Sequence, residues 1–395
     1  MRQTPLPTDS LPPSAATGGS DRYIFIACPW TPVGGGMFKV SDYLIRWQAP
    51  QPPAHAARLR PLDSRGGSSP LFSLWILLTA LARILRGRVE GRLAGVHVNI
   101  GERLSFVRKG VIVIACRALG VPVVLHLHAQ MKSFYDALPG PLQSLTRWVF
   151  SLPGCVLVIG PQARRFVTEV LQVPPERVEI VINGVPEAAQ QRRDPQPGAV
   201  QRVLFLGRLS QPKGVGDLLE ALAHRGFDRA RLEVTVAGGG DVAAYEARAR
   251  KLGIGGFVRF PGWCDQDAIG GLLAQTDVLV LPSYDEVLPL VILEALANGV
   301  AVVCTAVGEI PSLLTDGVDV VYVNPGDADG IAAALQRVLG QPELLERLER
   351  NGRALYERQF SMGRFFVRVA HVHQRTFGIA GHPIEPVART MERPQ

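Results

Sequence analysis

Short apolar runs rich in β-branched residues alternate along this chain with longer segments whose apolar residues repeat at helical spacing. The runs predict strands and the repeats predict helices. In the first half, strands are expected at 23–28, 96–100, 122–128 and 155–159, and helices at 37–47, 71–86, 106–119 and 142–152. Such alternation is typical of a parallel sheet covered by helices on both faces, with right-handed crossovers.

A second series of the same kind begins at Val203, after a polar, proline-bearing segment from 186 to 199 that predicts a domain linker. Its strands are expected at 203–207, 232–238, 278–283, 300–306 and 320–324 and at Val258, and its helices at 217–224, 242–252, 327–339 and 342–356, with a last helix at 362–377. The predicted fold class is α/β, with two Rossmann-like, doubly wound domains facing a cleft.

The domain bounds follow from this pattern. We expect a disordered lead-in at 1–20, a first domain at 21–186, a second domain at 198–357, a helix at 361–377 beyond it, and a loose tail at 378–395. The Pro-, Gly- and Ser-rich segment from Gln48 to Pro70 predicts a long surface loop.

Length and composition agree with two globular domains. A chain of 395 residues is longer than one hydrophobic core usually serves, and 47% hydrophobic with 19% charged residues suits a compact protein with large buried surfaces. The net charge of +7 is mild, so it favours anionic small molecules or an anionic membrane surface and does not indicate nucleic acid. The five cysteines are scattered and form no CxxC pair, which predicts free core thiols, no metal site and a reducing, cytoplasmic compartment.

The segment from Leu71 to Leu85 is the most apolar in the chain, but it is too short to span a bilayer and Arg83 interrupts its end. A buried helix is the prediction. An interfacial helix is the alternative, and it keeps a peripheral place on the inner face of the cell membrane open.

Two cations follow the first strand of the second series. Arg208 and Lys213 lie on either side of a turn, just before a helix at Asp217. Cations at a helix N-terminus form a phosphate site, because the backbone N–H groups and the helix dipole also favour negative charge. The plain alternative is two solvated charges at a turn.

Two carboxylates follow the strand at 278–283. Glu286 lies in the loop, and Glu294 lies eight residues later inside an apolar helix, where a carboxylate needs a partner. The two hydroxyl groups of a ribose would suit Glu294, while Glu286 lies close enough to the strand end to contact a sugar. A helix-start carboxylate is the simpler interpretation of Glu286.

In the first half, His126 and His128 share one face of a strand, and His128 is nearer its end and the cleft. His126 is expected to be a satisfied core histidine. The loop Gly34 to Gly36 precedes a helix and permits close backbone approach, although it lacks the GxGxxG and P-loop spacings. Further candidates are Gly238 to Asp241, Gly308, Glu309, Asn99, Arg108 and Lys109.

These motifs together resemble the family 4 glycosyltransferases of the GT-B fold. The resemblance rests on GRLSQPKG, GGGD, DEVLPLVILEALANG and TAVGEIP in the second half, and on GGG, HVNIGERLSFVRK and VVLHLH in the first. It implies a retaining transferase of the bacterial polysaccharide or glycolipid type, which moves a hexose-type sugar from a UDP- or GDP-type nucleotide sugar to a glycan or lipid-linked glycan. It also implies no cofactor and no metal, and a last helix that returns to the first domain.

The same resemblance assigns roles to the residues. Arg208 and Lys213 would bind the donor diphosphate, Glu294 the ribose and Glu286 the transferred sugar, with His128 near the reacting carbon. The catalytic residues expected are His128, Glu286, Arg208 and Lys213. The donor-binding residues expected are Gly34, Gly35, Gly36, Arg208, Lys213, Gly239, Glu286, Leu288 and Glu294. The acceptor-side residues expected are Asn99, Arg108 and Lys109.

Two positions depart from the family pattern, and three other classes of protein compete with it. Val287 follows Glu286 where many relatives carry glycine, and Ala129-Gln130 follows His128 where glycine is common. A catalytically quiet nucleotide-sugar-binding subunit would have no reason to keep the full set of Arg208, Lys213, Glu286, Glu294 and His128. A Rossmann oxidoreductase would carry GxGxxG, and a sugar-nucleotide epimerase would carry additional carboxylates in the first domain.

Overall fold

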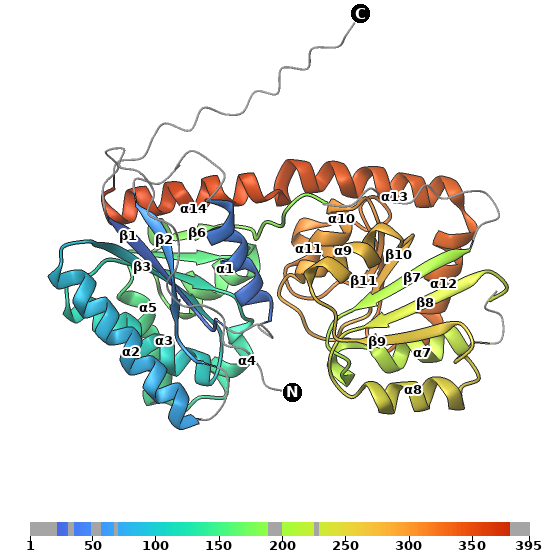
Figure 1. Cartoon of the computed structure of the whole chain (residues 1–395), viewed down its shortest axis with the longest axis horizontal. Helices are drawn as coiled ribbons and strands as arrows, with labels where there is room; N and C mark the ends of the chain where they lie inside the picture. The colour runs from blue at the N-terminus through green and yellow to red at the C-terminus, as the bar shows by residue number, and fades with distance from the viewer. Residues whose placement is uncertain are drawn as a thin grey trace, which may run out of the picture.

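Two six-stranded parallel sheets form the frame of the protein, one in each half of the chain (Figure 1). The structure is a computed structural model that describes residues 22–30, 35–48, 57–66, 70–188, 200–224 and 229–379. The strand orders are β2-β1-β3-β4-β5-β6 and β12-β11-β10-β7-β8-β9, and every pair of neighbouring strands is parallel. The predicted pair of doubly wound α/β domains is confirmed.

The first domain carries its helices on both faces of the sheet. Its strands are β1 (Tyr23–Cys28), β2 (Arg58–Asp63), β3 (Leu93–Ile100), β4 (Val123–Leu127), β5 (Cys155–Val158) and β6 (Val178–Ile180). Its helices are α1 (Gly36–Trp47), α2 (Pro70–Val89), α3 (Leu104–Ala118), α4 (Met131–Asp136), α5 (Gly140–Ser151) and α6 (Pro161–Arg165), followed by the short turns η1 (Phe166–Val170) and η2 (Pro175–Arg177).

The second domain repeats this plan. Its strands are β7 (Gln201–Leu206), β8 (Leu232–Ala237), β9 (Val258–Gly262), β10 (Val278–Leu281), β11 (Ala301–Thr305) and β12 (Val321–Val323). Its helices are η3 (Gln211–Lys213), α7 (Val215–Ala223), α8 (Val242–Lys251), α9 (Gln266–Ala274), α10 (Leu290–Ala297), α11 (Ile310–Leu313), α12 (Ala328–Gly340) and α13 (Pro342–Leu355), and η4 (Tyr356–Phe360) leads to α14 (Met362–Phe377).

The central strands are buried on both faces, which explains their continuous apolar sequences. Every residue of β1, β3, β4, β10 and β11 is buried. A strand covered by helices on both sides gains from apolar residues at every position, and the alternating pattern of a half-exposed strand is therefore absent. The cysteines are free, and all but Cys264 are buried, as the sequence predicts.

The segment predicted as one long loop, Gln48 to Pro70, contains a strand. β2 pairs with β1 alone and forms the edge of the first sheet. Its sequence, RLRPLD, contains Pro61 and two arginines and does not look like a core strand. An edge strand tolerates proline because one of its sides makes no ladder hydrogen bonds, so the loop prediction is wrong at 58–63.

Helix α2 is not the buried helix that its apolar sequence predicts. Leu77, Ala80 and Ile84 face the core, but most of its other large apolar side chains are exposed. Among the described residues, no helix is both long enough and apolar enough to cross a membrane.

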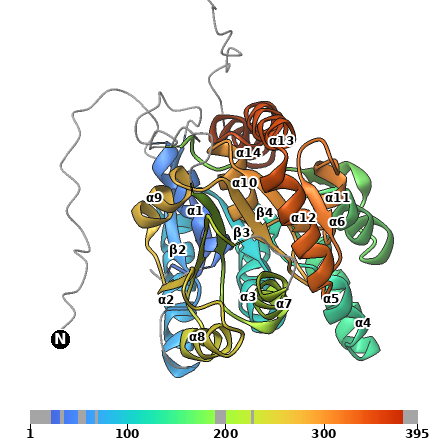
Figure 2. The same cartoon turned by 90° about the vertical axis from the view of Figure 1, so that its right-hand side faces the viewer.

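The chain crosses between the domains twice, and the two crossings lie side by side. Val185 and Ser361 form a parallel bridge, with hydrogen bonds from Val185 N to Phe360 O and from Met362 N to Val185 O. Beyond this point α14 packs against α1 and β4 of the first domain. Figures 1 and 2 show α13 and α14 running along the same side of the molecule.

Several predicted features lie outside the described residues. These are the lead-in at 1–20, Gly34, residues 189–199 of the linker, and the tail from 380.

Candidate functional site

In both sheets the strand order reverses next to the first strand of the domain, between β1 and β3 and between β7 and β10. Loops at such a reversal diverge at the carboxyl ends of the strands, and ligands of doubly wound sheets bind there. Arg208 and Lys213 follow β7, and Glu286 follows β10, so the topology brings both loops to one reversal. Asn99 and His128 come from the ends of β3 and β4 in the first domain.

Lys213 and Glu286 meet directly. The Lys213 ammonium forms an ion pair with Glu286 Oε1, and both side chains are largely shielded from solvent. Ser283 Oγ donates a second hydrogen bond to the same oxygen at 3.3 Å, and Thr305 Oγ1 holds the Ser283 carbonyl at 2.6 Å. Glu286 is therefore oriented by two neighbours through Oε1, while Oε2 has no hydrogen-bond partner among the described residues.

Two glycines permit the backbone approach on which this ion pair depends. Gly214 has φ +69°, and a Cβ there would stand 2.1 Å from the carbonyl oxygen of Pro282. Gly308 has φ +58°, and a Cβ there would stand 2.0 Å from the carbonyl oxygen of Glu286. Both positions combine a left-handed backbone with a contact that no side chain can enter, so only glycine fits.

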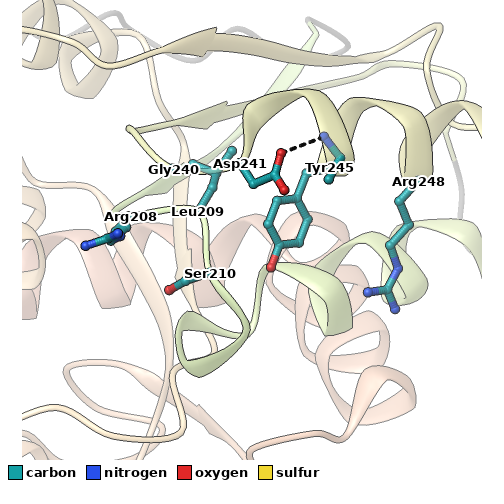
Figure 3. Close-up of a pocket in the computed structure, with 8 residues that line it drawn as sticks. Arg208, Leu209, Ser210, Gly240, Asp241, Tyr245 and Arg248 are labelled. Atoms are coloured by element: carbon teal, nitrogen blue, oxygen red, sulfur yellow. Dashed lines mark hydrogen bonds between the residues drawn. The ribbon is translucent and has the colours of Figure 1, made fainter.

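Arg208 is exposed and forms no ion pair or hydrogen bond with the part of the chain that the structure describes. It lines a pocket of about 670 Å³ with Leu209, Ser210, Gly240, Asp241, Ala244, Tyr245 and Arg248. Figure 3 shows its guanidinium pointing away from Tyr245 and Arg248, while Asp241 caps α8 by accepting from Ala244 N at 3.2 Å. The pocket is not lined by Lys213, Glu286 or Glu294, so it covers only one side of the predicted donor site.

Glu294 is 6% exposed, and its partners come from the first domain. Glu294 Oε1 accepts from the Tyr43 hydroxyl at 3.0 Å and lies 2.5 Å from the Lys39 ammonium. Burial, together with the Glu294 carboxylate, raises the pKa of Tyr43 well above its usual value, so its hydroxyl stays a donor. The sequence offered a ribose as the partner of this carboxylate. In the structure Tyr43 and Lys39 of α1 are partners of its Oε1, and ribose binding stays a prediction.

His128 is hydrogen-bonded to Asn99, with 2.8 Å between His128 Nε2 and Asn99 Oδ1. Because the Asn99 amide donates to the Ala27 carbonyl at 3.4 Å, its Oδ1 is the acceptor and His128 Nε2 carries the proton. Burial, with His97 and Lys109 nearby, lowers the pKa of His128 to about 3. The ring is therefore neutral, and its Nδ1 is an acceptor.

A row of buried histidines continues from His128 into the core. The His126 ring lies 4.0 Å from the His128 ring, and His97 bridges His126 at 3.3 Å and His373 of α14 at 2.8 Å. Burial lowers the pKa of His126 well below its usual value. His126 is a core histidine, as the sequence predicts, and it helps to attach the last helix. It is not fully satisfied, because its Nε2 has no hydrogen-bond partner among the described residues.

Lys109 is fully buried, so it does not form the exposed pair with Arg108 that the start of a helix would also allow. Its ammonium donates to Ser105 Oγ at 2.9 Å and lies 3.9 Å from the sulfur of Met37 at the start of α1. Burial, with Arg108 beside it, lowers the pKa of Lys109 to about 8. Burial also lowers the pKa of Arg108, whose Nε has no hydrogen-bond partner.

The remaining predicted donor residues take backbone or packing positions. Gly35 and Gly36 begin α1, and a Cβ on Gly36 would contact Leu290 across the domain boundary at 3.7 Å. Leu288 is buried, and the Gly239 carbonyl accepts from Leu209 N at 2.8 Å.

Three contacts between the domains were not predicted. Lys39 and Tyr43 are four residues apart on α1, a helical spacing that places both beside Glu294. Gln130, one of the two departures from the family pattern, donates from Nε2 to the Glu286 carbonyl at 2.5 Å. Glu309 accepts from Gln162 N and Ala163 N of α6 at 3.2 and 2.6 Å.

The other departure, Val287, keeps an ordinary backbone. It is not among the described residues with positive φ, and its carbonyl accepts from Glu309 N at 2.8 Å. Within the described ranges, no group of three or more His, Cys, Asp or Glu side chains is arranged to hold a metal ion.

Two family models match successive parts of the chain. "Glycosyl transferase 4-like domain" matches residues 34–184, and "Glycosyl transferases group 1" matches residues 188–355. Among curated proteins, an uncharacterized glycosyltransferase of Methanocaldococcus jannaschii is 28% identical over 217 residues, 51% of this chain and 55% of that protein. A glycogen synthase of Mycobacterium tuberculosis is 28% identical over 241 residues, 59% of this chain and 58% of that protein. The chain thus spans little more than half the length of these relatives.

Solved structures agree on the fold. A sucrose-phosphate synthase from Thermosynechococcus elongatus superimposes with a TM-score of 0.72 at 18% identity, over 90% of this chain and 99% of that one. HepE of Anabaena in complex with UDP-glucose superimposes with a TM-score of 0.69 at 18% identity, over 89% and 99%. The two matched domain models and the shared two-sheet architecture show that the chain belongs to the family 4 glycosyltransferases of the GT-B fold.

Proposed function

We propose that the protein transfers a hexose-type sugar from a UDP- or GDP-type nucleotide sugar to a glycan or lipid-linked glycan, with retention of the anomeric configuration. The observation that carries this proposal is the Lys213–Glu286 ion pair at the strand-order reversal of the second sheet. A cation for a phosphate and a carboxylate for a sugar stand together where doubly wound sheets bind nucleotides.

In this proposal the second domain binds the donor. Lys213 and Arg208 contact the diphosphate, and Glu286 and Glu294 accept hydrogen bonds from the transferred sugar and the ribose. When the bond between the anomeric carbon and the phosphate oxygen breaks, its electron pair stays on the diphosphate. The two cations stabilise that charge, which supports transfer without a metal ion or other cofactor.

The first domain presents the acceptor. His128 is neutral, and with Nε2–H directed at Asn99 its Nδ1 can accept from a sugar hydroxyl. Lys109 and Arg108 provide positive charge on the same side, which would suit an acceptor that bears phosphate. A cytoplasmic location on the inner face of the cell membrane would bring such a lipid-linked acceptor within reach.

Calorimetric titration of the full chain with UDP-, GDP- and ADP-glucose in EDTA tests the donor and the absence of a metal together. We expect one nucleotide class to bind in EDTA and to be hydrolysed or transferred. Binding that requires a divalent cation would contradict the metal-free proposal. Binding of one donor without any turnover would favour the quiet-subunit alternative, and binding of none would overturn the proposed donor site.

A further inference from the structure

Three neighbouring helices of the first domain expose most of the large apolar side chains on the surface. Of 17 such exposed side chains in the described ranges, 13 belong to α2, α3 and α5. These are Leu71, Phe72, Leu74, Trp75, Leu78, Leu85, Val89, Leu104, Val107, Val111, Leu142, Leu145 and Trp148. We call them the α2–α3–α5 face. Figures 1 and 2 show these helices together on the side of the first sheet away from α14.

On α2 the exposed residues form a stripe. Leu71, Trp75, Leu78, Leu85 and Val89 recur at intervals of three, four or seven residues, which places them along one side of the helix. The core-facing residues lie on the other side, so α2 is apolar toward the sheet and toward the outside. A helix that faces water is expected to be polar on its outer side.

Helices α3 and α5 extend this surface. Leu104, Val107 and Val111 repeat at helical spacing on α3, and Leu145 and Trp148 do so on α5. α3 contacts both α2 and α5, so the three helices that carry these stripes are neighbours. A monomer rarely leaves so many large apolar side chains in one area unless that area meets a partner.

The charge of the same region indicates which partner. Residues 70–151 contain ten Lys and Arg and three Asp and Glu, a net charge of +7 that equals the net charge of the whole chain. Arg103, which precedes α3, and Arg117, near the end of α3, are both exposed. Exposed apolar side chains in a region of net positive charge, with two tryptophans among them, suit the boundary between lipid headgroups and acyl chains.

We propose that the α2–α3–α5 face docks onto the surface of an anionic phospholipid bilayer. The helices would lie in the plane of the interface, with Trp75 and Trp148 at the headgroup level. A second copy of the chain fits less well, because a symmetric dimer places a patch against itself and would bring two regions of net charge +7 together.

The docked face would lie beside the acceptor side of the site. Leu104 is 70% exposed, and the next residue, Ser105, accepts the hydrogen bond from Lys109. Lys109 in turn reaches Met37 at the start of α1. Bilayer docking itself does not depend on the proposed transfer activity, and only its use in delivering a lipid-linked acceptor rests on that proposal.

Flotation of the full chain with vesicles of phosphatidylcholine, with and without phosphatidylglycerol, tests the docking. We expect flotation with the anionic vesicles, weakening as salt is added. Trp75→Ser/Leu78→Ser should weaken it by about tenfold or more, because each side chain loses the free energy of burial in the interface. Reversing two charges, Arg117→Glu/Arg147→Glu, should weaken binding to the anionic vesicles by about tenfold or more and leave any residual binding to phosphatidylcholine unchanged.

Trp263→Ser is the matched control. Trp263 is 58% exposed and Trp75 62% exposed, but Trp263 belongs to the second domain, so its replacement should leave flotation unchanged. Circular dichroism of each variant confirms that it folds. Absence of flotation in the wild type, or equal loss in Trp263→Ser and Trp75→Ser/Leu78→Ser, would overturn the proposal. A dimer that these α2 substitutions dissociate would identify the face as a protein interface instead. Donor titration gives a separate result, so loss of docking and loss of donor binding are distinguishable.

Discussion

The two domains share one strand plan, but they differ in what their surfaces and loop ends hold. Among the described residues, the first domain exposes 13 large apolar side chains on three helices and has a row of histidines behind the end of β4, in which burial lowers the pKa of His126 and His128. The second domain exposes few large apolar side chains, and the ends of its strands hold the Lys213–Glu286 ion pair between two conformationally required glycines. Division of roles between two similar folds therefore depends on loops and outer helix faces, and the sheets serve as frames.

Removing the Lys213 charge should have the largest effect on activity. Lys213→Ala leaves Glu286 without its cation and the leaving diphosphate without one of two stabilising charges, so we expect transfer to fall by about 10²-fold or more. The measurement is kcat/KM with the donor found by titration.

Lys251→Ala is the control for Lys213→Ala, since Lys251 is exposed at the end of α8 in the same domain. Near-normal turnover in Lys213→Ala would remove the second domain's role in phosphate binding.

Neutralising Glu294 should have an intermediate effect, because this residue joins the two domains. If Glu294 binds the ribose as proposed, Glu294→Gln removes a charged acceptor, and we expect KM for the donor to rise about tenfold, in line with a hydrogen bond to a charged group. Tyr43→Phe removes only the hydrogen bond from α1, so it should lower the free energy of unfolding by about 1 kcal/mol and leave KM nearly unchanged. Equal KM values in Glu294→Gln and wild type would place the ribose elsewhere.

The last prediction concerns stability rather than activity, and it is a pH dependence that originates at His128 of the first domain. The pKa of His128 is about 3 in the folded protein and near 6.5 when unfolded, so the unfolded state binds more protons between these values and stability falls as pH decreases from 6.5 toward 3. Each such histidine contributes up to about 1.4 kcal/mol per pH unit. His128→Gln should reduce the slope of unfolding free energy against pH, measured by denaturant titration at a series of pH values. An unchanged slope in His128→Gln would contradict the claim that burial lowers the pKa of His128.

Much of the fold could be predicted because its strands are buried on both sides and therefore apolar throughout. β2 could not be predicted in this way, since its arginines and proline suit an edge position that is recognised only when β1 is beside it. The outer side of α2 could not be predicted either, because an apolar sequence does not indicate whether its residues face a core or a lipid surface.

The candidate site shows the same limit. The need of Glu294 for a partner follows from its apolar helix, but Tyr43 lies 251 residues away in the chain and meets it only through docking of the domains. Lys213 and Glu286 could be assigned to one site because both directly follow strands whose carboxyl ends meet at one edge. Gln130, in contrast, contacts the Glu286 backbone only through the arrangement of the two sheets.

The side-by-side crossings at Val185 and Ser361 restrict how the domains can move. Because the two described crossings lie side by side at one edge, we expect rotation about an axis through that edge to be the relative motion that disturbs them least. A nucleotide sugar bound between the two domains would then enter and leave at the edge opposite these connections. If the first domain is held on a bilayer through the α2–α3–α5 face, the second domain is the one that rotates.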